Sequence, residues 1–285
     1  MSQSRLITVS SGKGGAGKTF VSILFCRELA RLGKRVALID VDLGTPNVHI
    51  KLRQKPSKSL DSVLQQQCSL SSALVEIPAD QWQPAVAPGG KFYFLKGVSG
   101  ASEFLGGDPD KQDKFLLDFQ GLLAQLADEV DLIVLDTGAG VEFNVVPFCM
   151  MAEDLLVVVC DDESSRSDAW ELMAIVQGLK DPPQSWVIAN QVKDEKMGRT
   201  ISNYLVKLLK KYCRSTTALP EYLGWIPDSG ESSSSAKGQS RAIDLMDTET
   251  DASRAIHQLA TLLLKHHAED VGDGYHDRVQ SILNR

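Results

Sequence analysis

A glycine-rich stretch near the N-terminus, S-G-K-G-G-A-G-K-T at residues 11–19, says more about the fold than any other part of the chain. Residues 12–19 fit the spacing G-x-x-x-x-G-K-[ST], between an apolar run at residues 6–9 and a helical pattern at residues 19–32. Glycines at these positions let successive backbone N–H groups turn towards one phosphate. The sequence therefore predicts a phosphate-binding loop that joins a buried strand to a helix.

The loop carries a lysine and a hydroxyl at the positions where a nucleotide site needs them. Lys18 can supply a positive charge to the outer phosphates, and Thr19 can supply a hydroxyl to Mg²⁺. A second lysine, Lys13, lies inside the loop and is not required by this spacing. We expect the loop and the residue after it to bind nucleotide: Gly12, Lys13, Gly14, Gly15, Ala16, Gly17, Lys18, Thr19 and Phe20.

Apolar runs alternate with helical patterns along the whole chain, which is typical of a parallel sheet covered by helices. Several runs consist of Val, Ile and Leu without alternation, as expected of strands buried on both faces. The predicted strands are residues 6–9, 36–40, 92–95, 132–136, 155–160, 186–190 and 223–226. The predicted helices are residues 19–32, 60–66, 110–127, 167–179, 201–213 and 251–267. We therefore expect an α/β fold with a doubly wound, mostly parallel sheet and helices on both faces.

Length and composition agree with one domain of this kind. The chain has 285 residues, of which 43% are hydrophobic, enough to fill a single core. We expect a P-loop domain over residues 1–270 and a C-terminal tail over residues 271–285. The net charge of -7 argues against broad, non-specific DNA binding, which needs a positive surface. The five cysteines form no C-x-x-C pair, so we expect reduced thiols and a cytoplasmic location.

Carboxylates follow two of the predicted strands. Asp40 and Asp42 end the second strand, where alternate residues face the same side and both can face the phosphates. Asp136 ends the strand at residues 132–136, and Gly138 after it could donate an N–H to the γ-phosphate. These residues predict a Mg²⁺ site that includes Thr19, Asp136 and one carboxylate of the pair Asp40 and Asp42, the other carboxylate positioning the attacking water. The alternative is a pair of ordinary strand-ending turns with solvated acids.

Two motifs carry a family resemblance. The loop matches K-G-G-x-G-K-[ST] from Lys13 to Thr19, and residues 40–47 match D-x-D-[IL]-G-x-x-N. The chain thus resembles the deviant-Walker ATPases, the family of MinD, ParA and FlhG/FleN. The resemblance implies that Lys13 reaches the nucleotide of a second subunit. It also implies that Asp42 orients the attacking water and that Asp40 is a Mg²⁺ ligand, through water. It makes Lys13, Lys18 and Asp42 the candidate catalytic residues.

The same resemblance extends to the base. Asn190, at the end of a predicted strand, matches an asparagine that hydrogen-bonds the adenine edge in the family. Pro227 and Asp228 match a loop that lines the adenine pocket, although each could also be a plain β–α turn. Two positions depart from the pattern, because Gln191 replaces an arginine and Asp161-Asp162 replaces Pro-Glu. The sequence D-T-G-A-G at residues 136–140 resembles the corresponding segment of FlhG/FleN more closely than that of MinD.

The resemblance implies an ATPase with ATP and Mg²⁺ as cofactors and a low turnover. It would form a homodimer when ATP is bound. The dimer would regulate the placement or number of a cellular structure, for which we expect flagella, and it would act together with a regulatory protein partner. Two alternatives stay open. One is a ParA-type ATPase that partitions DNA, and the other is a nucleotide-binding regulator that acts through protein contacts, such as a transcription anti-activator.

Three features near the C-terminus have open interpretations. Lys207, Lys210 and Lys211 form a basic stripe on the predicted helix 201–213, either a solvated face or a surface for DNA or an acidic partner. The tail at residues 271–285 has an amphipathic pattern and either docks on the domain or makes a weak, peripheral contact with the inner face of the membrane. His266 and His267 are expected at a solvated helix end.

Overall fold

The computed structural model of the chain describes residues 4–82, 87–98, 108–142, 144–179, 181–213, 218–228 and 250–269. The strands are β1 (Arg5–Ser11), β2 (Arg35–Val41), β3 (Val75–Glu76), β4 (Lys91–Leu95), β5 (Leu132–Ala139), β6 (Asp154–Val159), β7 (Gln184–Val192) and β8 (Glu221–Pro227). The longer helices are α1 (Lys18–Arg31), α6 (Pro109–Ala127), α8 (Glu163–Gln177), α9 (Glu195–Tyr212) and α10 (Asp251–Glu269). The shorter helices are α2 (Val48–Lys51), α3 (Leu60–Leu64), α4 (Leu70–Ala73), the 3₁₀ turn η1 (Ala79–Gln81) and α7 (Val146–Met151).

These strands form one sheet in the order β3-β4-β2-β5-β1-β6-β7-β8. Every neighbouring pair is parallel except β3 and β4, which are antiparallel. The central strands are buried along their length because helices cover both faces, and β6 is buried at all six positions. The predicted α/β class and mostly parallel sheet are confirmed, and the antiparallel edge strand β3 is an addition that was not predicted.

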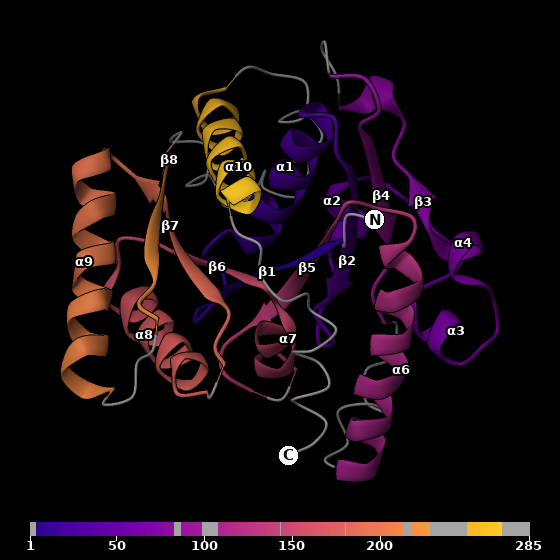
Figure 1. Cartoon of the computed structure of the whole chain (residues 1–285), viewed down its shortest axis with the longest axis horizontal. Coiled ribbons are helices and arrows are strands. Elements are labelled where there is room, and N and C mark those ends of the chain that lie inside the picture. Colours follow the sequence, from indigo (N-terminus) through magenta and orange to yellow (C-terminus); the bar gives the residue numbers. More distant parts are fainter. Residues whose placement is uncertain are drawn as a thin grey trace.

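Helices form a layer on each face of the sheet (Figure 1). Helices α1 and α10 contact each other and cover one face, with α1 on β1, β2 and β5 and α10 on β8. Helices α6, α7, α8 and α9 cover the other face, each against the strand beside it. The sheet therefore separates two apolar layers, and the carboxyl ends of its parallel strands form one edge where ligands bind in such folds.

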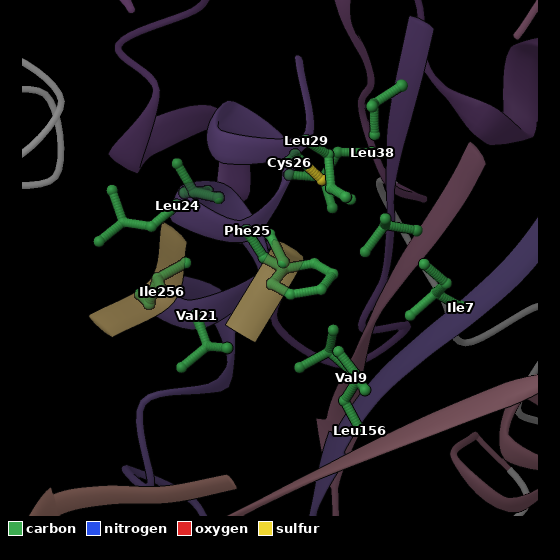
Figure 2. Close-up of a cluster of buried hydrophobic side chains, with 14 of the residues drawn as sticks. Ile7, Val9, Val21, Leu24, Phe25, Cys26, Leu29, Leu38, Leu156 and Ile256 are labelled. Atoms are coloured by element: carbon green, nitrogen blue, oxygen red, sulfur yellow. The ribbon is translucent and has the colours of Figure 1, made fainter. Parts of the chain in front are cut away.

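Helix α1 is held by the core beneath it, and this core fixes the loop that precedes the helix. Phe25 is fully buried among side chains from β1 and from α10, as Figure 2 shows for Ile7, Val9 and Ile256. The whole helix from Val21 to Ala30 is buried. A helix enclosed in this way gives the glycine-rich loop a rigid base.

Several element boundaries differ from the sequence prediction for a physical reason. Helix α8 begins at Glu163 and α9 at Glu195, before the predicted starts, because Asp162 and Asp194 accept N-cap hydrogen bonds from Ser165 and Met197. The four-residue helices α2 and α4 and the six-residue α7 were not predicted, since such short segments carry too little periodicity.

The solvated end expected for α10 is wrong. His267 Nε2 lies 2.8 Å from Asp154 Oδ2 at the base of β6, and its side chain is 11% exposed. His266 lies edge-on to the ring of Trp186, with 4.8 Å between ring centroids. The two histidines thus attach the end of α10 to the sheet.

Two further expectations concern the C-terminal tail and the membrane. The amphipathic tail predicted at residues 271–285 lies outside the described residues. None of the helices described for this chain combines the length and the hydropathy of a membrane-spanning segment.

Candidate nucleotide site

The loop between β1 and α1 has the backbone that phosphate binding needs. Gly15 and Gly17 have φ angles of +85° and +92°, which residues with side chains rarely adopt. Gly17 is the N-cap of α1 and provides no side-chain cap, so the first N–H groups of the helix can face an anion. Lys18 and Thr19 follow as the first residues of that helix.

Two glycines of the loop are also required by close neighbours. A Cβ atom at Gly12 would lie 2.0 Å from the backbone carbonyl carbon of Asp168 in α8. A Cβ atom at Gly17 would lie 2.3 Å from the side-chain nitrogen of Asn190 at the end of β7. The loop is thus enclosed by α8 on one side and by β7 on the other, whereas Gly14 and Gly15 remain exposed.

Lys18 and Thr19 lie beside a buried carboxylate. Lys18 is 9% exposed. Burial lowers its pKa, although the negative charges of Asp136 and Asp42 act in the other direction. Asp136 accepts hydrogen bonds from the Thr19 side chain and from Ser22 Oγ, the latter at 2.7 Å. A cation, a hydroxyl and a carboxylate therefore meet at the base of the loop.

Asp40 and Asp136 are neighbours on adjacent strands, opposite each other in the register of β2 and β5. Burial, with the charge of Asp136, raises the pKa of Asp40 to about 8, although backbone N–H groups of Val48 and Asp42 act in the other direction. Burial raises the pKa of Asp136 to about 6, although the hydrogen bonds from Ser22 and Thr19 and the positive charge of Lys18 each lower it. Two buried carboxyls of this kind become anionic more easily when a divalent cation is bound.

The oxygens at this point fit Mg²⁺, which prefers hard oxygen ligands and keeps several waters. Thr19 provides a hydroxyl, and Asp40 and Asp136 provide carboxylates. Within the described residues, no three His, Cys, Asp or Glu side chains form a cluster that could hold a metal ion alone. Phosphate oxygens and water would have to complete the shell, as is usual for Mg²⁺ in P-loop sites.

Asp42 connects the loop after β2 with the end of β5. Its Oδ1 accepts hydrogen bonds from the backbone N–H of Gly44 at 3.1 Å and of Thr45 at 2.9 Å. A Cβ atom at Gly138 would lie 3.4 Å from the same oxygen. The two segments predicted to face the γ-phosphate are therefore neighbours, and Asp42 lies between them.

The second loop lysine has a different environment from Lys18. Lys13 Nζ lies 3.0 Å from Asp162 Oδ1, and both side chains are 43% exposed. Asp162 also caps α8, and the N–H of Ser165, the Ser164 hydroxyl and Lys13 hold the pKa of Asp162 at about 2 despite partial burial. Lys13 is thus directed over the surface of α8 within its own chain.

On the side predicted for the base, Asn190 is 2% exposed and its Nδ2 donates a hydrogen bond to the Ala16 carbonyl at 2.8 Å. Its Oδ1 accepts no hydrogen bond from the residues that the structure describes. Gln191 follows as an exposed residue with a φ of +59°. Pro227 and Asp228 lie beside the end of β7, where the Asp228 N–H donates to the Val192 carbonyl at 3.2 Å.

The structure brings most of the predicted residues together at the carboxyl edge of β1, β2, β5, β7 and β8. Phe20 differs, since it is partly buried against the core next to α1. The sequence analysis did not predict the hydrogen bond from Ser22 to Asp136. Ser22 lies four residues after Lys18, one turn along the helix, and this spacing could have indicated that it faces the same site. It also missed the pairing of Lys13 with Asp162, for which the opposite charges were the available signal.

Comparisons with known proteins agree with this geometry. A family model described as CobQ/CobB/MinD/ParA nucleotide binding domain matches residues 7–242. The chain is 32% identical to the antiactivator FleN of Pseudomonas aeruginosa over 223 residues, which cover 78% of this chain and 73% of FleN. It is 30% identical to the flagellum site-determining protein YlxH of Helicobacter pylori over 232 residues, 79% of this chain and 70% of YlxH.

Solved structures share the fold. The septum site-determining protein MinD of Pyrococcus horikoshii, complexed with Mg-ADP, superposes with a TM-score of 0.66 at 19% identity, over 93% of this chain and 98% of that one. A chain of the MinC:MinD cell division protein complex of Aquifex aeolicus superposes with a TM-score of 0.65 at 25% identity, over 92% of this chain and 96% of that one.

Proposed function

The chain belongs to the CobQ/CobB/MinD/ParA family of nucleotide-binding proteins, and from this premise we propose that it is an ATP-dependent dimerisation switch. It binds ATP with Mg²⁺, hydrolyses ATP slowly, and regulates the placement or number of a cellular structure. We propose the flagellum as the cellular structure that it regulates, because the relative YlxH is a flagellum site-determining protein. A regulatory protein partner would act on the dimer, and the cytoplasm is the proposed location.

In this mechanism, backbone N–H groups of the loop and of the start of α1 bind the phosphates, and Lys18 neutralises their charge. Thr19, Asp40 and Asp136 would hold Mg²⁺, which supplies further positive charge to the phosphate oxygens. Gly138 would donate its N–H to the γ-phosphate.

Asp42 accepts a proton or a hydrogen bond from the attacking water, because it is the half-exposed carboxylate between the two segments that face that phosphate. Asn190, Pro227 and Asp228 would surround the base. The two loop lysines would then have separate tasks, one within the subunit and one across the dimer.

The observation that carries the proposal is the contrast between these lysines. Lys18 is buried at the base of the loop, whereas the Lys13 side chain is 43% exposed and forms a surface ion pair with Asp162. A surface ion pair contributes little free energy, so Lys13 can exchange Asp162 for a phosphate of a second subunit. This contrast favours a dimer that shares its nucleotides over a monomer that uses both lysines alone.

The test uses sedimentation of the purified protein with Mg²⁺ and a non-hydrolysable ATP analogue. Wild type should form dimers, Lys13→Ala should bind the analogue but stay monomeric, and Asp42→Ala should dimerise without turning over ATP. Dimers of Lys13→Ala, or wild-type turnover by Asp42→Ala, would contradict the proposed roles.

A second candidate function is that of an antiactivator, because the relative FleN is an antiactivator. A regulator of that kind could act through protein contacts with nucleotide bound and no turnover. Steady ATP hydrolysis by wild type that is lost in Asp42→Ala supports the switch. Binding without any hydrolysis supports the antiactivator.

A further inference from the structure

The exposed face of α9 carries a row of cations. Lys196, Arg199, Lys207, Lys210 and Lys211 are all exposed and repeat every three or four residues, apart from the neutral Asn203 within the series. This spacing aligns them along one side of the helix, over roughly 20 Å at 1.5 Å per residue. We call these five residues the α9 cation row. Helix α9 lies at the outer edge of the molecule, beside α8 and β8 (Figure 1).

The row is short of negative partners. Arg199 pairs with Glu195 at 2.7 Å, but the four lysines have no carboxylate partner among the described residues. Lys211 lies instead over the ring of Tyr212, 4.8 Å from its centroid. Like charges three or four residues apart destabilise a helix. An external anion would relieve this repulsion.

Among the described residues, the surface around the α9 cation row is mixed in charge. Exposed carboxylates lie on two elements that contact α9, with Glu171 on α8 and Glu221 on β8, whereas Asp251 on α10 is paired with Arg254. DNA presents two phosphate strands and an anionic bilayer presents a plane, so both would bring negative charge against these carboxylates on a chain whose net charge is already -7. A single narrow acidic segment avoids that repulsion.

We propose that the α9 cation row binds an acidic helical segment of a partner protein. Carboxylates repeated every three or four residues on that helix would have the same spacing as the cations, so several pairs could form in one register. Tyr204, which is 47% exposed, borders the row and offers a hydroxyl donor to the same segment. The proposed function does not require this surface.

The test measures anisotropy of two labelled helical peptides of the same composition at low ionic strength. One has its glutamates on a single face at every third or fourth position, and the other has them scattered around the helix. The single-face peptide should bind roughly tenfold more tightly than the scattered one, and its binding should weaken as salt rises. Equal binding of the two peptides overturns the proposal.

A matched pair of variants separates the row from general charge. Lys207→Glu/Lys210→Glu should weaken binding of the single-face peptide roughly tenfold, since two attractive pairs become repulsive. Lys111→Glu/Lys114→Glu makes the same charge change, also one turn apart, on the exposed face of α6, and should leave binding unchanged.

Retention of the ATP analogue and the thermal midpoint show that both variants are folded. The proposal is also overturned if reversal of Lys207 and Lys210 has no effect on binding of the peptide. The same holds if duplex DNA or phosphatidylserine vesicles bind wild type through these lysines more tightly than the peptide does.

Discussion

At the scale of single residues, Asp40 and Asp136 connect pH with metal binding. Their folded pKa values, about 8 and about 6, lie above the ordinary value of 3.8, so the folded protein without nucleotide holds protons that the unfolded chain releases. Its stability should therefore fall as pH rises from near 3.8 to about 8. Binding of Mg²⁺ displaces these protons, so affinity for the Mg²⁺–nucleotide should rise over the same window.

Isothermal titration at several pH values, in buffers of different ionisation enthalpy, measures both the affinity and the protons released. Asp40 is the group that dominates the upper part of the window. An affinity that does not change with pH, or binding without proton release, would show that these carboxyls are already ionised.

Asn190 leads to a prediction about the base. One hydrogen of its Nδ2 is donated to the Ala16 carbonyl, whereas its Oδ1 accepts no hydrogen bond from the described residues and is available to a ligand. An acceptor suits the amino group of adenine and repels the carbonyl oxygen of guanine. Wild type should prefer ATP to GTP, and Asn190→Ala should weaken ATP binding roughly tenfold while lowering that preference. Titration with both nucleotides checks this, and an unchanged preference would remove Asn190 from base recognition.

At the scale of elements, α1 joins the phosphate loop to a buried charge network at its other end. Glu28 is fully buried and accepts hydrogen bonds from Arg27 and Arg31, and His257 of α10 lies 3.0 Å from its Oε2. Glu28→Ala would remove the buried carboxylate to which Arg27 and Arg31 donate, which should lower the free energy of unfolding by about 3–5 kcal/mol.

Urea denaturation measures the effect of Glu28→Ala. Glu76→Ala, which removes an exposed partner of Lys91, should stay close to wild type. If the two variants are equally stable, the network does not anchor α1.

The elements also show how far the sequence could be used for prediction. Long apolar runs and the loop spacing were sufficient for the main strands and for α1, because burial on both faces leaves a strong local pattern. The starts of α8 and α9 depend on the capping aspartates 162 and 194, and β3 depends on pairing with β4, which no local pattern reveals. In the site, the loop, Asp40 and Asp136 could be predicted from motifs, whereas the Lys13–Asp162 pair depends on how α8 packs beside the loop.

At the scale of the whole molecule, the proposed ATP-dependent dimer requires that this ion pair break. Lys13 must leave Asp162 before it can reach another subunit, so weakening the pair should favour the dimer. Asp162→Asn keeps a side chain that can cap α8 but removes the charge. It should lower the protein concentration needed for half dimerisation with the ATP analogue by roughly two- to fivefold, because each of the two subunits gives up one weak, half-exposed ion pair.

Sedimentation over a concentration series measures this change. Asp161→Asn is the matched control, because it removes a neighbouring carboxylate that pairs with Arg166 at 2.6 Å and not with Lys13. A dimer weakened by Asp162→Asn would mean that Asp162 supports assembly instead of opposing it.

The absent side chain at Gly12 has a mechanical consequence. Because there is no room for even one carbon between the phosphate loop and the backbone of α8, the loop cannot move towards α8 without displacing that helix. Helix α8 in turn contacts α9, so a displacement of the loop would be transmitted through two adjoining helices to the outer rim of the molecule. Binding or release of a phosphate at the loop would then change the position of α9, which lies away from the nucleotide site.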